Sequence, residues 1–257
     1  MQFTVEYLES ILLVLVRISS MIVAAPFFNL SNVPRKVKAG LAFFLTVIAL
    51  QVVDYRTIEY TGTLGYAALV LQEAITGLII GIASGFCLYI LSFSGHMIDM
   101  EIGFSMAMEF DPMTNVQTTI SANLFSQIFL VIFVVSDMHY FLIDAIYDSY
   151  QMIPIGGANL KGDFLSVMLT YISDYFIIGF RIILPVFSCI LIINVVLGVL
   201  AKVAPQMNMF VIGMQLKVFV GLFLVFLVMG LMPNVADFLF VEMQKMTKLF
   251  LEALSPS

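Results

Sequence analysis

Charged residues are scarce in this sequence. Lys, Arg, Asp and Glu make up 11% of its 257 residues, whereas hydrophobic residues make up 61%. A soluble domain is nearer half apolar and a quarter charged, so this chain is built for lipid or for burial in a large assembly. The net charge is −6 and no basic patch occurs, so we do not expect nucleic acid as a partner.

Residues that carry chemistry are also few. Cys87 and Cys189 stand alone inside apolar runs, which is typical of small core residues with reduced thiols. His96 and His139 lie far apart and belong to no metal-type cluster. G-x-S-x-G, P-loop and G-x-G-x-x-G patterns are absent from the sequence. We therefore expect no enzymatic activity, no metal and no cofactor. The acidic N-terminus also argues against a cleaved secretory signal, which would be basic.

Long apolar runs dominate what is present. Six of them stand out, at residues 8–30, 37–53, 64–94, 124–146, 164–200 and 207–240. A bilayer core takes about 20 helical residues, so several runs are long enough to span one. No linker divides the chain. The sequence therefore predicts an all-α, membrane-associated bundle of long helical hairpins, as one domain over residues 1–257.

The third run carries a packing signal. Gly77, Gly81 and Gly85 recur every four residues and therefore share one helix face. Such a glycine ridge lets the backbone of another helix approach closely. The pattern predicts tight helix packing and nothing more specific.

Four charged side chains lie in apolar runs and are predicted to be buried: Arg17, Glu73, Arg181 and Lys217. An unpaired charge in such a place costs several kcal/mol. For Arg17 a structural pair with a carboxylate is the preferred interpretation, and a functional charge is the alternative. Glu73 is either an interfacial acid or the buried partner of a base. We expect partner subunits to supply some of the missing counter-charges.

The polar stretch at residues 95–123 interrupts the apolar runs. It carries five acidic or histidine side chains, no Lys or Arg, and five methionines. Gly95 and Gly103 loosen it, and Pro112 stops any helix that arrives from its N-terminal side. It is either a solvated loop or a flexible, methionine-rich stopper inside a passage built by protein, because Met fills irregular gaps. Composition leaves both open.

The last two runs meet at a polar elbow, whose marking residues are Lys202, Pro205, Gln206 and Asn208. Two long helices folded back at this elbow form a hairpin with a polar, glycine-lined inner face. The tail, residues 242–257, is expected to be amphipathic and solvated.

Four segments together resemble one family. They are AAPFFNLSNVPRKVKAG at residues 24–40, the Gly-rich to Asp-Pro segment at 95–112, the Pro-Ile-Gly turn within 152–157, and LGVLAKVAPQMNMFVIG at 197–213. They are similar, in the same order, to blocks of the FliR family, the R subunits of the flagellar type III export gate. Relatives of that family serve virulence injectisomes.

The resemblance implies a non-enzymatic, pore-forming subunit of an export gate in the bacterial inner membrane, within the flagellar basal body. It implies a P-like part followed by a Q-like C-terminal hairpin. The implied partners are P-type and Q-type subunits in a hetero-oligomer, the large export-gate subunits with cytoplasmic domains, unfolded exported proteins and membrane lipid.

A pore plug is also implied by the resemblance. Its residues, carried over by position, are Gly103, Phe104, Met106, Met108, Phe110, Asp111 and Pro112. Family members often place an aromatic or small polar residue where this chain has Met106, Met108 and Glu109.

A different function class is a small proton-coupled secondary transporter that uses Glu73, Asp99 and Glu101. Such a carrier would be expected to show internal repeats with matching broken helices. No such repeat is visible in the sequence, which favours the export-gate interpretation.

Overall fold

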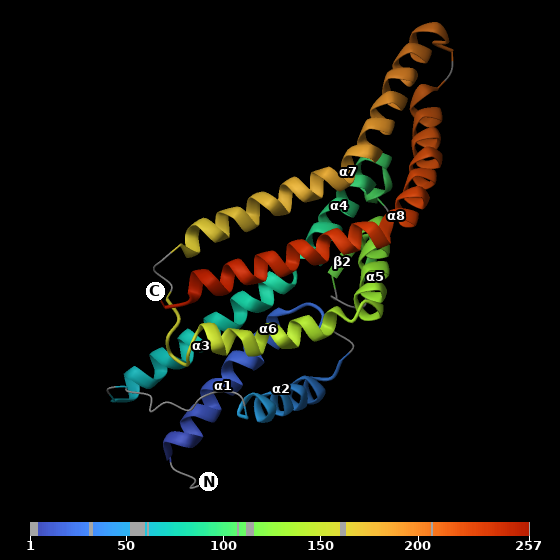
Figure 1. The fold of residues 1–257 in the computed structure, drawn as a ribbon. Coiled ribbons are helices and arrows are strands. Elements are labelled where there is room, and N and C mark those ends of the chain that lie inside the picture. Colours follow the sequence, from blue (N-terminus) through green and yellow to red (C-terminus); the bar gives the residue numbers. More distant parts are fainter. Residues whose placement is uncertain are drawn as a thin grey trace. The chain divides into compact units, whose positions relative to one another are not determined.

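The computed structural model describes residues 5–30, 33–51, 60, 62–106, 108–111, 116–159, 163–206 and 208–256. Its elements in chain order are α1 (Val5–Ala24), α2 (Arg35–Ala49), α3 (Gly62–Ser84), α4 (Phe86–Ile102), the 3-10 turn η1 (Phe104–Met106), β1 (Met108–Asp111), β2 (Val116–Thr119), α5 (Ile120–Val135), α6 (Met138–Met152), α7 (Phe164–Val203) and α8 (Met209–Leu254) (Figure 1). The predicted all-α class is confirmed, and the short β1–β2 ribbon is the one strand pair in the described part of the chain.

The apolar runs coincide with helices, but two of them break. The third run breaks at Gly85, between α3 and α4. The fourth run breaks before Asp137, whose φ of 55° is left-handed, and α5 and α6 meet there at a bend of 74°. Asp tolerates this conformation better than the β-branched residues before it. Four of the described helices are long and apolar enough to cross a membrane, or five spans if the bent pair counts as one.

Contacts within the chain gather in two compact units. The first unit comprises residues 1–87, 134–172 and 240–257, and the second comprises residues 88–133 and 173–239. The chain therefore passes between the units several times, through α4, α5, α7 and α8. The expectation of a single domain over residues 1–257 stays a prediction.

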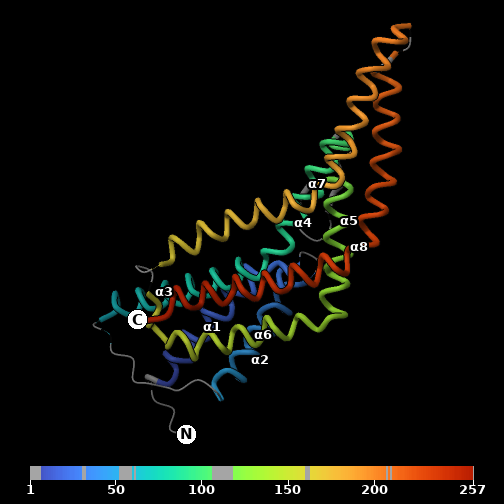
Figure 2. Tube along the Cα trace, turned by 45° about the horizontal axis from the view of Figure 1, so that its top comes forward, coloured from blue at the N-terminus to red at the C-terminus, as the bar shows by residue number. Residues whose placement is uncertain are grey.

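In the first unit α1 packs along α3, with α2 beside α1 (Figure 2). Gly77 and Gly81 lie at this crossing. A Cβ at Gly81 would lie 2.8 Å from the carbonyl oxygen of Met21 and 2.5 Å from Cβ of Ala24. A Cβ at Gly77 would overlap the carbonyl oxygen of Arg17. The absence of a side chain therefore sets the distance between the two helices.

The C-terminal part of α8 completes the first unit. Met243, Met246 and Phe250 are buried, and the ring of Phe250 lies 5.6 Å from that of Tyr171. The carbonyl oxygen of Leu254 accepts a hydrogen bond of 2.9 Å from the backbone N–H of residue 159. The expectation that the tail is solvated is therefore wrong for one of its faces, because its apolar residues recur at helical spacing and pack inward.

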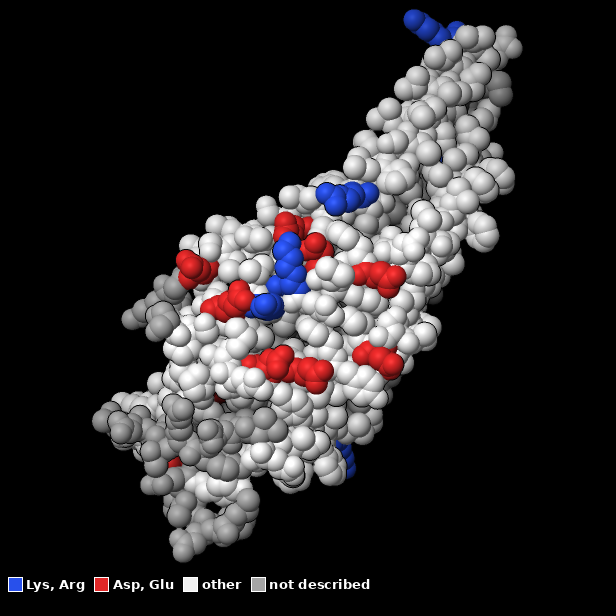
Figure 3. Space-filling model, in the orientation of Figure 1, with Lys and Arg blue, Asp and Glu red and all other residues white. Residues whose placement is uncertain are grey.

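In the second unit the last part of α7 and the first part of α8 run side by side as a hairpin in both views (Figures 1 and 2). Residues 182–236 contain only two charged residues, Lys202 and Lys217. The face of the hairpin drawn in Figure 3 is accordingly almost free of charge except at its end. Such a surface fits lipid or protein better than water.

Candidate functional site

The mid-chain segment at residues 103–119 leaves the helices at Gly103. The helix α4 continues to Ile102, so the first eight residues of the predicted polar break are helical. Gly103 has a φ of 96°, which favours glycine and turns the chain out of α4. After η1 the strands pair antiparallel, with Met108 opposite Thr119 and Asp111 opposite Val116. The segment is thus a short ribbon joining α4 to α5.

Asp99 anchors both ends of this ribbon. Its Oδ2 accepts a hydrogen bond of 2.7 Å from the backbone N–H of Ser121, and its Oδ1 accepts one of 2.6 Å from the Ser121 hydroxyl. Asp99 is 0% exposed and Ser121 is 2% exposed. A carboxylate here satisfies a free N–H in the first turn of α5 and interacts favourably with the helix dipole. The sequence suggests Asp99 only as a carrier acid and gives no sign of this role, because its partner lies 22 residues away.

Two close contacts at glycines also hold together the helices on which the ribbon starts and ends. A Cβ at Gly95 would lie 2.5 Å from the backbone nitrogen of Ala122, so α4 and α5 are in direct contact. A Cβ at Gly221 would lie 2.5 Å from Cγ1 of Ile102, so α8 packs against the last turn of α4. The ribbon therefore starts and ends on helices that are fixed to one another.

Six of the seven expected plug residues fall on the described part of this ribbon. Gly103 is exposed and Phe104 is half-buried at the start of η1. Met106 ends η1, while Met108, Phe110 and Asp111 belong to β1. Pro112 lies outside the described residues. The segment contains two paired strands, and the two interpretations, a solvated loop and a flexible stopper, both stay predictions.

A buried ion pair forms the second cluster of interest, in the first unit. Nε of Arg17 lies 2.6 Å from Oε2 of Glu73, and Nη2 lies 3.0 Å from Oε1. Nη1 of Arg17 donates to the carbonyl oxygens of Ser149 and Ile153, at 3.2 and 3.0 Å. Oε1 of Glu73 also accepts from the backbone N–H of Gly156 at 2.8 Å. The pair therefore connects α1, α3, α6 and the turn after α6.

This pair agrees with one expectation and corrects another. Arg17 is 1% exposed and Glu73 is 0% exposed, and each satisfies the other, which agrees with the structural-pair interpretation. Neither needs a counter-charge from a partner subunit. The aromatic ring of Tyr150 adds a cation–π contact, with Cζ of Arg17 4.3 Å from its centroid.

The other two charges are placed differently. Arg181 is exposed, so the prediction that it is buried is wrong for the chain by itself. Gly179, two residues earlier, faces Phe93, and the intervening helical rotation turns Arg181 away from that contact. Lys217 is half-buried and lines a cavity together with Glu101.

The remaining predicted positions are at helix ends. Lys202 lies in the last turn of α7, and Pro205, Gln206 and Asn208 lie between Val203, where α7 ends, and Met209, where α8 begins. These four side chains are exposed. Gly85 lies at the break between α3 and α4 rather than on a continuous ridge.

Most of this chain matches a known protein family. A family described as "Bacterial export proteins, family 1" matches residues 8–243, which include both the ribbon and the Arg17–Glu73 pair. The chain belongs to this export protein family. The resemblance stated from the four sequence segments is confirmed.

Individual members of the export family align over nearly the whole chain. The flagellar biosynthetic protein FliR of Bacillus subtilis (strain 168) is 31% identical over 234 residues, which cover 90% of each chain. FliR of Escherichia coli (strain K12) is 28% identical, covering 89% of this chain and 87% of its own. FliR of Pectobacterium carotovorum subsp. carotovorum is 27% identical, covering 94% and 92%.

The geometry of this export-family chain also bears on the transporter alternative. A proton carrier needs acids that can exchange protons with water. Glu73 is held by Arg17 and Gly156, and Asp99 is held by Ser121. Two of the three candidate acids are therefore committed to buried structural contacts.

Proposed function

We propose that this chain is a structural, pore-forming subunit of the flagellar protein export gate in the bacterial inner membrane, and that it catalyses no reaction. The observation that carries the proposal is full-length similarity to proteins named flagellar biosynthetic protein FliR, inside an export protein family. The helices long enough to span a membrane support the location.

The ribbon at residues 103–119 is the proposed plug of the pore at rest, with Met106, Met108 and Phe110 as its bulky side chains. Two features support this role. Its ends are anchored at Asp99–Ser121 and Gly95–Ala122, so a displaced ribbon returns to the same place. A two-stranded ribbon is only marginally stable by itself, and Met side chains repack easily, so the segment moves aside at low cost.

Other subunits are proposed to cover the hairpin of α7 and α8. Only 17% of the most apolar stretch of each of these two helices is buried by the rest of the chain, compared with 39% for α1 and 44% for α3. We propose P-type and Q-type subunits as the neighbours, with the exposed elbow at Lys202 and Gln206 docking against Q-type hairpins. The large export-gate subunits and unfolded exported proteins complete the proposed set of partners.

The plug is tested by removing part of it. Deleting residues 105–109 takes away two of the three residues of η1 and the first half of β1 but keeps Asp99, Gly103 and Ser121. The assembled complex is placed in planar bilayers and its ion conductance is measured. We expect raised conductance, because nothing else of comparable bulk is proposed to fill the resting pore.

A matched control keeps the bulk of the plug. Replacing Met106 and Met108 by Leu preserves volume and apolar character, so conductance should stay at the level of the unmodified complex. If the deletion leaves conductance unchanged in a complex shown to be assembled, the ribbon is an ordinary solvated connection and the plug is refuted.

A further inference from the structure

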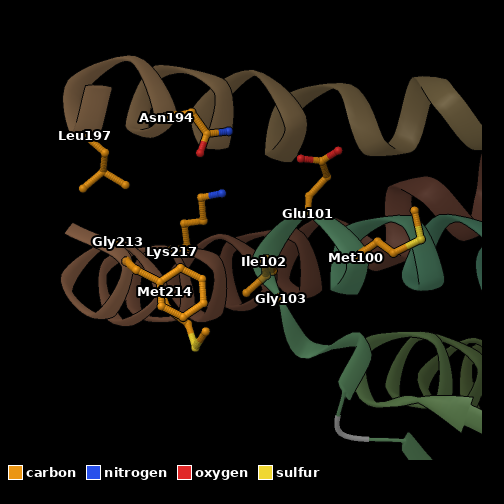
Figure 4. Close-up of a pocket in the computed structure, with 10 residues that line it drawn as sticks. Met100, Glu101, Ile102, Gly103, Asn194, Leu197, Gly213, Met214 and Lys217 are labelled. Atoms are coloured by element: carbon orange, nitrogen blue, oxygen red, sulfur yellow. The ribbon is translucent and has the colours of Figure 1, made fainter. Parts of the chain in front are cut away.

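A cavity of about 300 Å³ lies within the second unit, between the last turn of α4 and the hairpin of α7 and α8. Its wall is mostly apolar, from residues such as Ile102, Leu197 and Met214. Three polar side chains interrupt that wall. Figure 4 shows Glu101, Lys217 and Asn194 directed into the same space between the helices.

The two charged groups in this cavity have no partner in the described part of the chain. Glu101 and Lys217 are both half-buried, and neither makes a hydrogen bond or an ion pair there. Lys217 is also one of only two charges in residues 182–236. An unpaired ammonium in so apolar a stretch is costly, and so is a half-buried carboxylate without a partner. The cavity therefore favours an occupant that satisfies both.

We propose that this cavity binds the headgroup of a zwitterionic phospholipid that carries a primary ammonium, such as phosphatidylethanolamine. The phosphate accepts hydrogen bonds from the ammonium of Lys217 and the amide of Asn194, and the lipid ammonium donates to the carboxylate of Glu101. Gly103, where the ribbon begins, also lines the cavity, but the assignment does not require the ribbon to act as a plug. It uses both charges and the neutral amide donor, each with a group of the opposite character.

The charges exclude simpler headgroups. A purely anionic headgroup satisfies Lys217 but brings its charge close to the Glu101 carboxylate. A trimethylated ammonium has no N–H to donate to Glu101, so a choline headgroup makes only the phosphate contact in full.

The surroundings of the cavity suit the rest of a lipid. Phe210, Met100 and Met214, which also line it, are 76%, 60% and 46% exposed. Apolar side chains on the rim of a charged site provide a surface on which acyl chains can lie. A lipid therefore matches both the inside of the cavity and its edge.

The test measures which lipids remain bound. The complex that contains the full-length chain is purified in mild detergent, with an equimolar mixture of phosphatidylethanolamine, phosphatidylglycerol and phosphatidylcholine. Bound lipids are counted by native mass spectrometry. We expect retention of phosphatidylethanolamine about tenfold above the other two, the effect of one charge-assisted hydrogen bond.

Variants assign the two ends of the headgroup. Glu101→Gln should abolish the preference for phosphatidylethanolamine while some lipid stays bound, and Lys217→Gln should lower retention of all three lipids. Lys248→Gln is the matched control, since it removes an exposed lysine of α8, the helix that carries Lys217, at a position outside the cavity, and it should leave lipid retention unchanged.

Three results would overturn the proposal. One is equal retention of the three lipids by the unmodified complex, which decides the matter even if the variants do not assemble. The second is a lowered thermal stability of the Glu101→Gln complex that is the same whichever of the three lipids is supplied. That result would mean that Glu101 and Lys217 pair directly with each other. The third is a segment of a neighbouring subunit filling the cavity in an image of the complex.

Discussion

Individual residues in this protein hold together segments that are far apart in the chain. Arg17 and Glu73 are 56 positions apart, and Asp99 and Ser121 are 22 apart. In both cases the charged group is almost completely buried and is matched by well-placed partners. A buried charge is tolerated only when it is satisfied in this way, so removing one partner should cost more than the net contribution of the contact.

The first prediction concerns the ion pair. Glu73→Gln should lower the free energy of unfolding by about 3–5 kcal/mol, because the Arg17 guanidinium stays buried without its counter-charge. The amide oxygen can still accept from Gly156, so the loss isolates the charge. Thermal or denaturant unfolding of the purified complex in detergent measures this loss.

The pair Lys245–Glu242, whose lysine is exposed, supplies the control for this measurement. Lys245 is 56% exposed, and Lys245→Ala should change the free energy of unfolding by no more than about 0.5 kcal/mol. Equal effects of Glu73→Gln and Lys245→Ala would show that the buried pair is not a main support of the first unit.

The second prediction concerns the anchor of the ribbon. Asp99→Ala leaves the buried backbone N–H of Ser121 without an acceptor, at a cost of about 1–3 kcal/mol. Hydrogen exchange at residues 118–121 should become faster, because the start of α5 opens more often. Ser126→Ala removes only a hydroxyl that bonds within the same helix and should leave this exchange unchanged. Slow exchange in Asp99→Ala would contradict the anchoring role.

At the scale of whole elements, glycine decides how closely the helices of each unit approach. Gly81 and Gly77 bring α3 against α1, Gly95 brings α4 against α5, and Gly221 brings α8 against α4. In membrane-type helices, where lipid is as apolar as the side chains, close packing of this kind supplies much of the association energy.

The third prediction uses two glycines in opposite surroundings. Gly81→Ala places a Cβ 2.5 Å from that of Ala24 and should destabilise the protein by about 1–3 kcal/mol, and Gly81→Leu should separate α1 from α3 altogether. Gly230→Ala, in α8, meets nothing within 4 Å and should be neutral or stabilising by up to about 1 kcal/mol, since Ala favours helix. Thermal stability and assembly with the co-expressed subunits measure both. Normal assembly of Gly81→Leu would show that this face of α3 has room to spare.

At the scale of the whole molecule, much of the apolar surface of α7 and α8 is left uncovered by the chain. Large side chains such as Phe219, Phe226 and Val203 are 73%, 69% and 75% exposed. Exposed apolar surface of this extent marks contact with lipid or other proteins. The cover that α7 and α8 need therefore comes from outside the chain.

The fourth prediction follows from that need for cover. Produced without the proposed P-type partner, the chain should be degraded or should aggregate, whereas co-expression with that partner should give a protease-resistant complex. Limited proteolysis and size-exclusion chromatography of the two preparations distinguish these results. A well-folded, protease-resistant monomer would count against a role as an obligate subunit.

The sequence by itself determined the features that depend on local pattern. Apolar runs of membrane length predicted the long helices, and the elbow around Pro205 and Asn208 predicted the turn of the hairpin correctly. Glycines at a spacing of four predicted a close helix approach, which Gly77 and Gly81 make. These features follow from helical periodicity and from the backbone properties of Gly and Pro, which act over a few residues.

Only the tertiary structure decided which distant groups meet. The sequence offered several carboxylates to Arg17 and could not select Glu73, and it gave Asp99 no partner. It predicted Arg181 to be buried, whereas Arg181 is exposed, and it predicted a solvated tail at 242–257, one face of which is buried around Phe250. Periodicity shows that a helix has an apolar face but does not identify the element that covers it, because contacts between distant segments depend on how the whole chain packs.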